Sequence, residues 1–337
     1  MKKLCVIFVM ALAVVMFAGC AGDETAQSSA DTSVLNLVDG NFSIASLQIA
    51  AHPALDAARN GFLSGLADEG FVEGHNLEFD IFNALGDMSN AHIMAVQIVD
   101  NEPDLILGIA TSTSQALAQA TTTIPITITA VTSPYRADLV DSHERPNRNV
   151  TGTTDMTPVA IQFDLITRLF PEVQTVGILY NSGEINSAIQ ADLAEEAANA
   201  LGLTLDRMSV AVAGDIMQAA QMLANRVEVI YTPTCNLIAA GMVAVVRASE
   251  ELGVPVVAGD SGSVANGALI TYGVDYYELG RQTAVMAAQI LRGEAQPQTM
   301  PIQSQAQYRF AVNTETARIL GIEIPADILA AATIYEN

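Results

Sequence analysis

Several residue types are scarce or missing in this chain of 337 residues. Tryptophan is absent, aromatic residues make up 5% of the chain, and lysine occurs only at Lys2 and Lys3. With 14 basic against 37 acidic residues, the formal net charge is −23. Such a charge opposes binding to the polyanionic backbone of nucleic acid and, without an anchor, to an anionic lipid surface. We therefore expect no nucleic-acid partner.

Cysteine and histidine are also few, which limits disulfide, metal and redox chemistry. The chain has three cysteines and four histidines, namely Cys5, Cys20, Cys235, His52, His75, His92 and His143. No pair of histidines has metal-ligand spacing, and a lone cysteine is no zinc site. Neither common type of glycine-rich phosphate loop is present. We expect no metal and no cofactor.

The N-terminus has the pattern of a bacterial export signal. Lys2 and Lys3 precede an apolar run, Leu4 to Phe17, that is short for a membrane span. The following residues, Phe17-Ala18-Gly19-Cys20, resemble a lipobox. We predict a signal peptide over 1–19, lipidation at Cys20 and a flexible tether over 20–41. An uncleaved anchor would place the protein on the same side of the membrane.

In the predicted mature chain Cys235 has no cysteine partner, because Cys5 lies in the signal and Cys20 carries lipid. Without the two lysines, 12 Arg against 37 Asp and Glu give a net charge of −25.

From residue 42 onward, short apolar runs alternate with longer helical patterns, which is typical of βα units and parallel sheets. The expected strands of the first series are 44–50, 76–82, 104–109 and 124–128, with helices 53–70, 87–100 and 114–121. The expected strands of the second series are 150–153, 175–180, 204–209, 227–231, 255–258 and 268–272, with helices 159–170, 186–202, 215–225, 236–253 and 276–293. The tail suggests a strand at 309–312 and a helix at 314–320. We predict an α/β fold of two similar lobes, with the loop 135–149 as the best candidate for a crossing between them.

Ligands of open α/β sheets bind at the carboxyl ends of the strands, so the strand-to-helix turns are the candidate site. The stretch Leu105 to Ala120 passes from strand to turn to helix and carries a cluster of hydroxyls. We predict that Thr111, Ser112 and Ser114, with free N–H groups of the helix, hold the carboxylate of a small ligand. The alternative is that Thr111 or Ser112 only caps the helix.

Two acidic residues at such turns, Glu184 and Asp260, are candidates to bind an ammonium group. Alternatively, both stabilise the start of a helix through its dipole. Tyr180, Leu55 and Pro53 are candidates to contact the ligand side chain, although Tyr180 alternatively closes its strand. Cys235 fits a structural thiol. The remaining polar residues of the predicted cleft are Thr132, Ser133, Asn181, Asn186, Ser187 and Asn236.

An enzyme is a remote alternative. Gly259-Asp260-Ser261-Gly262-Ser263 is similar to the nucleophile segment of chymotrypsin-like proteases, but those are β-barrels and this segment joins a strand to a helix. A serine hydrolase would pair Ser261 with His52, the one histidine at a predicted strand end. We expect a protein that is not an enzyme.

Several segments together resemble one family, the extracytoplasmic substrate-binding lipoproteins of ABC transporters that include tryptophan-binding proteins. The matching segments are 52–62 (HPALDAARNGF), 70–74 (GFVEG), 84–87 (ALGD), 124–126 (IPI), 149–152 (NVTG), Tyr180-Asn181 with Glu184 and Asn186-Ser187, and 275–282 (DYYELGRQ). The resemblance implies a type I periplasmic-binding fold, distantly like that of leucine/isoleucine/valine-binding proteins. Two Rossmann-like lobes joined by three crossings would then clamp the ligand.

The resemblance also implies domain limits and two departures. The chain would cross near Pro134 and return near Ala258, which puts Asp260 and the helix at Tyr276 in the first lobe. The implied N-terminal lobe is 42–134 plus 258–296, and the implied C-terminal lobe is 135–257 plus 297–330. Ser133 and Cys235 stand where the family usually has Asp, which changes the expected charge of the site.

We therefore expect the solute-binding component of an ABC importer. Its ligand would be an amino acid, aromatic or otherwise apolar, or a related carboxylate, captured by closure of the cleft. A membrane permease with a cytoplasmic ATPase would be its partner, and the protein would be a monomer held outside the cytoplasm by its lipid. The alternative is a sensor domain of the same fold that works with a membrane receptor, and neighbouring permease and ATPase genes would distinguish the two.

Overall fold

The computed structural model describes residues 37–336. The predicted signal peptide, Cys20 and most of the predicted tether lie outside the described residues. Among the helices that are described, none combines the length and apolar character needed to cross a membrane.

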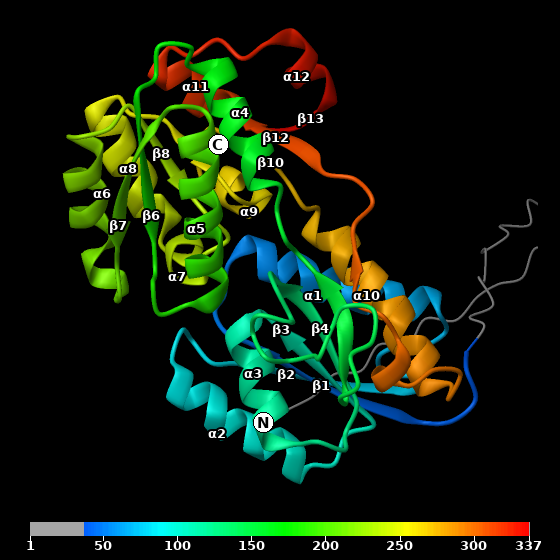
Figure 1. The fold of residues 1–337 in the computed structure, drawn as a ribbon. Helices are drawn as coiled ribbons and strands as arrows, with labels where there is room; N and C mark the ends of the chain where they lie inside the picture. Colours follow the sequence, from blue (N-terminus) through cyan, green and yellow to red (C-terminus); the bar gives the residue numbers. More distant parts are fainter. Residues whose placement is uncertain (1–36, 337) are drawn as a thin grey trace, which may run out of the picture. The chain divides into compact units, whose positions relative to one another are not determined.

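The first lobe is a parallel sheet covered by helices on both faces (Figure 1). Within residues 37–336 it has six strands, in the order β11-β5-β4-β3-β1-β2. These strands are β1 (Phe42–Gln48), β2 (Leu77–Asn83), β3 (Leu105–Ile109), β4 (Ile126–Val131), β5 (Val150–Thr154) and β11 (Gln303–Ser304). Its helices are α1 (Pro53–Asp68), α2 (Met88–Asp100), α3 (Thr111–Ala120) and α10 (Tyr276–Leu291). Burial on both faces explains why the central strand β3 is entirely buried.

The second lobe is built the same way, on a sheet that has seven strands over the same described range, in the order β13-β12-β10-β9-β8-β6-β7. The last two strands of the order, β12 and β13, run parallel to each other and opposite to the rest, because β12 pairs antiparallel with β10. Its strands are β6 (Thr175–Tyr180), β7 (Thr204–Ser209), β8 (Val229–Thr232), β9 (Val256–Ala258), β10 (Ile270–Gly273), β12 (Arg309–Asn313) and β13 (Ala332–Tyr335). Its helices are α4 (Val159–Leu169), α5 (Ile185–Ala200), α6 (Ile216–Ala224), α7 (Asn236–Ala240), α8 (Met242–Leu252), α9 (Ser261–Ala265), α11 (Thr314–Leu320) and α12 (Ala326–Ala331), with a 3-10 turn η1 (Ala213–Asp215). The second 3-10 turn, η2 (Pro297–Thr299), lies against β5 of the first lobe. The predicted α/β class with two parallel-sheet lobes is confirmed.

The lobe limits implied by the resemblance are wrong. The strand β5 pairs with β4 in the first sheet, so the first crossing follows Thr154 instead of Pro134. The strands β9 and β10 belong to the second sheet, which places Asp260 in the second lobe. The chain returns after Gly273, and α10 packs along α1 as expected. A third crossing in the described chain follows β11 and leads to β12.

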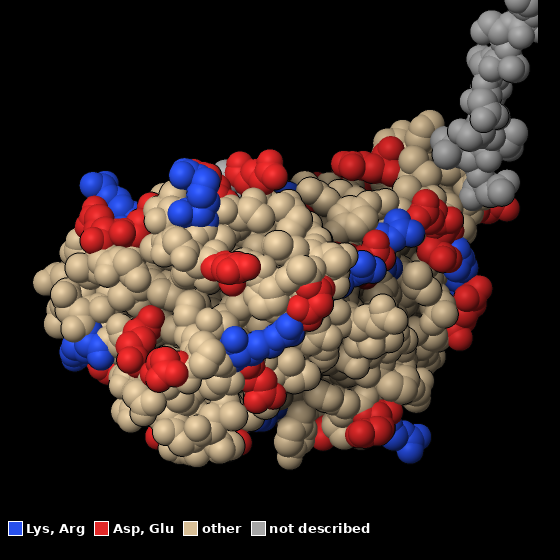
Figure 2. Space-filling view, turned by 90° about the horizontal axis from the view of Figure 1, so that it is seen from above, with Lys and Arg blue, Asp and Glu red and all other residues tan. Residues whose placement is uncertain are grey.

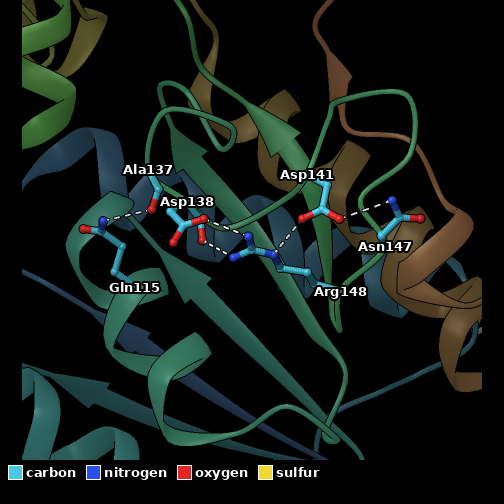
Figure 3. Close-up of polar contacts among 6 residues, drawn as sticks. All are labelled: Gln115, Ala137, Asp138, Asp141, Asn147 and Arg148. Atoms are coloured by element: carbon cyan, nitrogen blue, oxygen red, sulfur yellow. Dashed lines mark hydrogen bonds and ion pairs between the residues drawn. The ribbon is translucent and has the colours of Figure 1, made fainter.

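The loop before β5 was predicted to be a linker because it contains proline and scattered charges. It instead folds back on the first lobe (Figure 3). Arg148 Nη2 lies 2.7 Å from Asp138 Oδ1, and Arg148 Nε lies 3.0 Å from Asp141 Oδ1. Gln115 Nε2 of α3 donates to the carbonyl oxygen of Ala137 at 2.9 Å. These contacts keep the loop on the lobe from which it starts.

Two glycines allow α1 and α10 to pack closely. A Cβ at Gly61 would lie 2.0 Å from the carbonyl oxygen of Tyr277, and a Cβ at Gly280 would lie 2.0 Å from that of Ala58. Any larger residue would therefore push the helices apart. This contact positions the starts of both helices, where His52 and Tyr276 lie.

Many arginines on the surface lie beside an acidic residue, and the face shown in Figure 2 is largely uncharged between the charged side chains. Examples are Arg168 with Asp327 at 2.7 Å and Arg318 with Glu315 at 2.6 Å. Exposed pairs of this kind contribute little to stability.

Candidate functional site

Strand ends and helix starts of both lobes meet around a small cavity of about 10 Å³. Its lining residues are His52, Ala54, Leu55, Ala130, Asp155, Asn186, Thr234, Cys235, Asn236, Ala239, Asp260 and Tyr276. Hydrogen bonds cross between the lobes here: His52 Nε2 lies 3.3 Å from Asn236 Oδ1, and the hydroxyls of Thr132 and Thr234 are 3.3 Å apart. A volume of this size holds about one water-sized group.

The structure brings together some of the predicted site residues. Those that line the cavity are Leu55, Asn186, Cys235, Asn236 and Asp260. Two more contact a lining residue: Thr132 bonds to Thr234, and Glu184 accepts from Asn236. The predicted residues outside the lining are Pro53, Thr111, Ser112, Ser114, Thr132, Ser133, Tyr180, Asn181, Glu184 and Ser187.

Helix α3 begins at Thr111, three residues earlier than predicted. Its N-cap is Ala110, whose φ of 82° lies in the left-handed region that side chains other than glycine rarely adopt. No side chain caps the helix, so the interpretation of Thr111 or Ser112 as a cap is wrong. The Thr111 hydroxyl is 1% exposed and has no hydrogen-bond partner, whereas Ser114 donates to the Ala110 carbonyl at 2.7 Å.

Glu184 and Asp260 both bind the starts of helices. Glu184 is the N-cap residue of α5, but its carboxylate accepts from the backbone N–H groups of Asn236 and Leu237, both at 2.9 Å, at the start of α7. Asp260 caps α9: its Oδ1 accepts from Ser263 N at 2.8 Å and its Oδ2 from Ser263 Oγ at 2.7 Å. Each carboxylate therefore already has protein donors on both oxygens.

Asp155 is a lining residue that the sequence analysis did not select. It follows β5 directly and is 2% exposed. Its Oδ2 accepts from the Tyr276 hydroxyl at 2.7 Å, and its Oδ1 has no hydrogen-bond partner. Burial raises the pKa of Asp155 and the charge of Asp260 adds to this, although the hydrogen bond from Tyr276 opposes it. Burial and the neighbouring Asp155 raise the pKa of Tyr276, so its hydroxyl remains a donor.

The sequence contains a signal for Asp155, because the residue stands directly after a predicted strand. The turn after this strand was not among the predicted site positions. Tyr276 lies in a segment quoted for the resemblance, and His52 was weighed only as a partner for Ser261. Thr234 was not predicted as a site residue, although it directly precedes Cys235.

Three predicted residues serve the local structure around them. The Tyr180 hydroxyl accepts from Arg207 at 3.2 Å, and the Arg207 guanidinium lies 5.4 Å from the Tyr180 ring centre. Tyr180 therefore has a structural role at the end of its strand. Asn181 Oδ1 accepts from Gly183 N within the following turn. Ser133 Oγ accepts from Arg136 N at the start of the loop before β5.

Cys235 is 1% exposed, and burial raises the pKa of its thiol, with a further increase from the charge of Glu184. An inert structural thiol fits this environment. Ser187 is fully buried nearby on α5. The serine–histidine pair of the enzyme alternative is not formed: His52 Nε2 binds Asn236, and its Nδ1 has no partner.

Comparisons with known proteins agree with this architecture. The sequence profile of the family described as ABC transporter substrate binding protein matches residues 43–335. A curated relative, the tyrosine-binding protein of Clostridioides difficile (strain R20291), is 32% identical over 322 residues, which cover 96% of this chain and 93% of the relative.

Two solved structures have the same fold but superpose on this chain with different TM-scores. The ABC domain from Streptococcus pneumoniae in complex with L-Trp is 34% identical, with a TM-score of 0.84 over 88% of this chain and 100% of the other. The ligand-free, open structure of a substrate-binding protein from Clostridium difficile is 35% identical over the same shares of both chains, but its TM-score is 0.67. At nearly equal identity, the structure thus superposes more closely on that of the complex. The chain belongs to the family of ABC transporter substrate-binding proteins.

Proposed function

We propose that this protein captures an amino acid with an aromatic or other apolar side chain for an ABC importer. The observation that carries the proposal is the set of buried, unpartnered polar atoms at the facing ends of the two lobes, among them those of Thr111, Asp155 and Asn186. An unpaired buried polar group costs about 1–3 kcal/mol, so a bound ligand that satisfies such groups favours the closed arrangement. The relatives named for tyrosine and solved with L-Trp support the choice of ligand class.

The ligand carboxylate is assigned to the start of α3. The first N–H groups of a helix lack partners inside it and attract anions, and α3 has no side-chain cap. The buried Thr111 hydroxyl supplies one more donor, with Ser112 beside it. Ser114 is left out of this role because its hydroxyl already donates to Ala110.

Small apolar residues supply apolar surface for the ligand side chain. Ala54, Leu55, Ala130 and Ala239 line the cavity, and the Tyr276 ring adds an aromatic surface. Since the cavity itself has space for about one water-sized group, an amino acid enters only when the lobes part. Capture by opening and closing at the three crossings follows from this geometry.

We expect the protein to act outside the cytoplasm, where substrate-binding proteins of ABC importers bind their permease. We propose that lipid at Cys20 anchors the protein, as a monomer, to a bacterial membrane, and that residues 20–41 form a flexible tether between the lipid and the lobes. Metabolic labelling with a fatty-acid analogue tests this, because Cys20→Ser should abolish the label and release the protein from the membrane.

A thermal-shift screen against the common amino acids tests the ligand class. Ligand at 100 times its Kd stabilises the folded state by about 2.7 kcal/mol, which raises Tm by several degrees. We expect tryptophan or tyrosine to give the largest shift. If sugars or inorganic anions raise Tm and no amino acid does, the proposed ligand class is wrong.

A further inference from the structure

Three side chains that line the cavity each have one polar atom without a partner. These atoms are His52 Nδ1, Asp155 Oδ1 and Asn186 Oδ1. The three residues are 7%, 2% and 4% exposed, so they are shielded from bulk water. His52 precedes α1 in the first lobe, Asp155 follows β5 at the first crossing, and Asn186 lies in the first turn of α5 in the second lobe.

The hydrogen bonds around Asn186 fix which end of its amide is free. Asn186 Nδ2 donates to the backbone carbonyl of Thr234 at 2.7 Å. A carbonyl oxygen can only accept, so the amide nitrogen must face it. The free atom, Oδ1, is therefore an acceptor.

A short chain of contacts fixes the tautomer of His52 in the same way. Asn236 Nδ2 donates to Glu184 Oε2 at 2.7 Å, and because a carboxylate only accepts, Asn236 Oδ1 is the atom that faces His52. His52 Nε2 must then carry the proton in its 3.3 Å contact with that oxygen. In the neutral ring the other nitrogen, Nδ1, is an acceptor.

The third free atom belongs to a carboxylate. Asp155 is held by the Tyr276 hydroxyl through Oδ2, which leaves Oδ1 facing the remaining space. Asp260, the other carboxylate of the lining, adds negative charge, although its oxygens are already bonded to Ser263. No lysine or arginine is among the lining residues of the described chain.

We infer that these three acceptors form a cage for a primary ammonium group, with Asp155 as its charged member. An –NH3+ group has three N–H donors, one for each acceptor, and is close in size to the single water for which the cavity has room. The positive charge is neutralised by a carboxylate in a site from which water is excluded. The inference deepens the proposed function, because it assumes that the cavity belongs to the ligand site.

The cage makes a prediction about ligands that the proposed function does not. A secondary ammonium lacks one donor and leaves one buried acceptor unpaired. An α-hydroxy acid has one donor and no positive charge, so it leaves two acceptors and the charge of Asp155 unpaired. A site with buried polar groups rejects analogues that cannot pair them much more strongly than it rejects a change in apolar size.

Calorimetric titration with three tryptophan-derived probes tests the cage: L-tryptophan, N-methyl-L-tryptophan and indole-3-lactate. For the unmodified protein we expect affinity to fall about tenfold or more from the first probe to the second. We expect it to fall at least about 100-fold from the first probe to the third. Asp155→Asn should weaken L-tryptophan binding at least about 30-fold while changing indole-3-lactate little. Asp164→Asn, an equal change of charge at an exposed position of α4, is the matched control and should leave all three unchanged.

His52→Phe provides a second variant, which removes one acceptor and retains the ring. It should reduce the preference for the primary over the secondary ammonium. The melting temperature of each variant shows whether it folds. If the unmodified protein binds L-tryptophan but accepts indole-3-lactate equally well, or if Asp155→Asn retains both affinity and preference, the cage is wrong and the proposed function stands. If neither L-tryptophan nor any other amino acid binds, both are wrong.

Discussion

Three carboxylates lie at or beside the cleft, and their hydrogen bonds separate their roles. Glu184 and Asp260 accept from the first turns of α7 and α9, a common use of acidic residues at helix starts. Asp155 has one oxygen bound by Tyr276 and the other free. Two carboxylates, Asp155 and Asp260, line the cavity although the turns at Ser133 and Cys235 carry no acid.

Ligand affinity should depend on pH through Asp155. Its pKa lies above the ordinary value of 3.8, because burial and the nearby Asp260 favour the neutral form. An ammonium ligand needs the charged form, so affinity should fall as pH drops through the raised pKa, by up to about tenfold per pH unit. Titrations from about pH 8 to about pH 4 should show this slope, and Asp155→Asn should remove it.

The raised pKa of Asp155 also affects the stability of the unliganded protein, which should fall as pH rises. For a group whose pKa is raised by folding, the stabilisation is present below the unfolded-state value and is lost as pH rises through the folded-state value. Asp155 therefore favours unfolding near neutral pH, and Asp155→Asn should raise the unliganded Tm there.

A ligand affinity that does not change across the pH range in the unmodified protein would contradict the role given to Asp155.

Thr111→Val separates binding from stability. Its hydroxyl is buried and unpartnered, so replacing it with a methyl group should leave the unliganded Tm unchanged or raise it by a few degrees. Loss of a donor to the ligand carboxylate should weaken binding by about 1–2 kcal/mol. Thermal melts and calorimetry measure the two effects.

Thr113→Val is the matched control two residues along α3. The Thr113 hydroxyl is also buried but donates to the Ile109 carbonyl at 2.6 Å. This variant should lose about 1 kcal/mol of stability and retain its affinity. If Thr111→Val also retains its affinity, the carboxylate does not sit at the start of α3.

Among the elements, the crossing of α1 and α10 controls the geometry of the cavity. Gly280→Ala places a methyl group against the Ala58 carbonyl, a contact that only movement of the helix backbone can relieve. We expect destabilisation of about 2–4 kcal/mol, together with weaker ligand binding because His52 and Tyr276 move apart. Chemical denaturation measures the first effect and calorimetry the second.

Gly214→Ala is the control for that substitution, since nothing lies within 4 Å of the added atom and the backbone needs no positive φ there. It should change stability by no more than about 0.5 kcal/mol. Equal stability of the two variants would show that the helices do not depend on the close contact.

The sequence predicted most helices and strands, because apolar periodicity and proline or glycine punctuation mark them clearly. It missed the start of α3, because that start depends on Ala110 at φ 82°, a conformation with no signal in residue type. It also misassigned β5, since the contacts of Arg148 that fold the preceding loop back join residues through tertiary structure.

On the scale of the whole molecule, three neighbouring crossings connect the two lobes. Gln305 Oε1 accepts from Asp275 N at 3.0 Å, which joins the second and third crossings. The Tyr308 hydroxyl donates to the Met156 carbonyl at 3.1 Å, which joins the third to the first. Gln190 Nε2 of the second lobe donates to the Thr132 hydroxyl of the first at 3.3 Å, and this bond between the lobes favours the closed arrangement.

Small-angle X-ray scattering should detect closure. The lobes must part to admit an amino acid, and the ligand contacts both lobes only after they close. The radius of gyration should therefore decrease when L-tryptophan is added to the purified protein. No decrease under saturating ligand would contradict capture by closure.

The resemblance found in the sequence named the family and the two-lobed fold correctly, because its motifs lie at close helix contacts such as Gly61 and Gly280 and at strand ends. It could not supply the atoms that remain free in the cleft. Those depend on which donors the fold brings to each carboxylate and amide, as the different surroundings of Glu184 and Asp155 show.

Titration with L-tryptophan tests the central claim most directly, and fluorescence can follow it because the chain itself has no tryptophan. The account predicts saturable binding of one ligand per chain with a Kd of about 10 µM or lower, reduced at least about 30-fold by Asp155→Asn. Undiminished binding by Asp155→Asn, or no binding of either L-tryptophan or L-tyrosine by the unmodified protein, would contradict it.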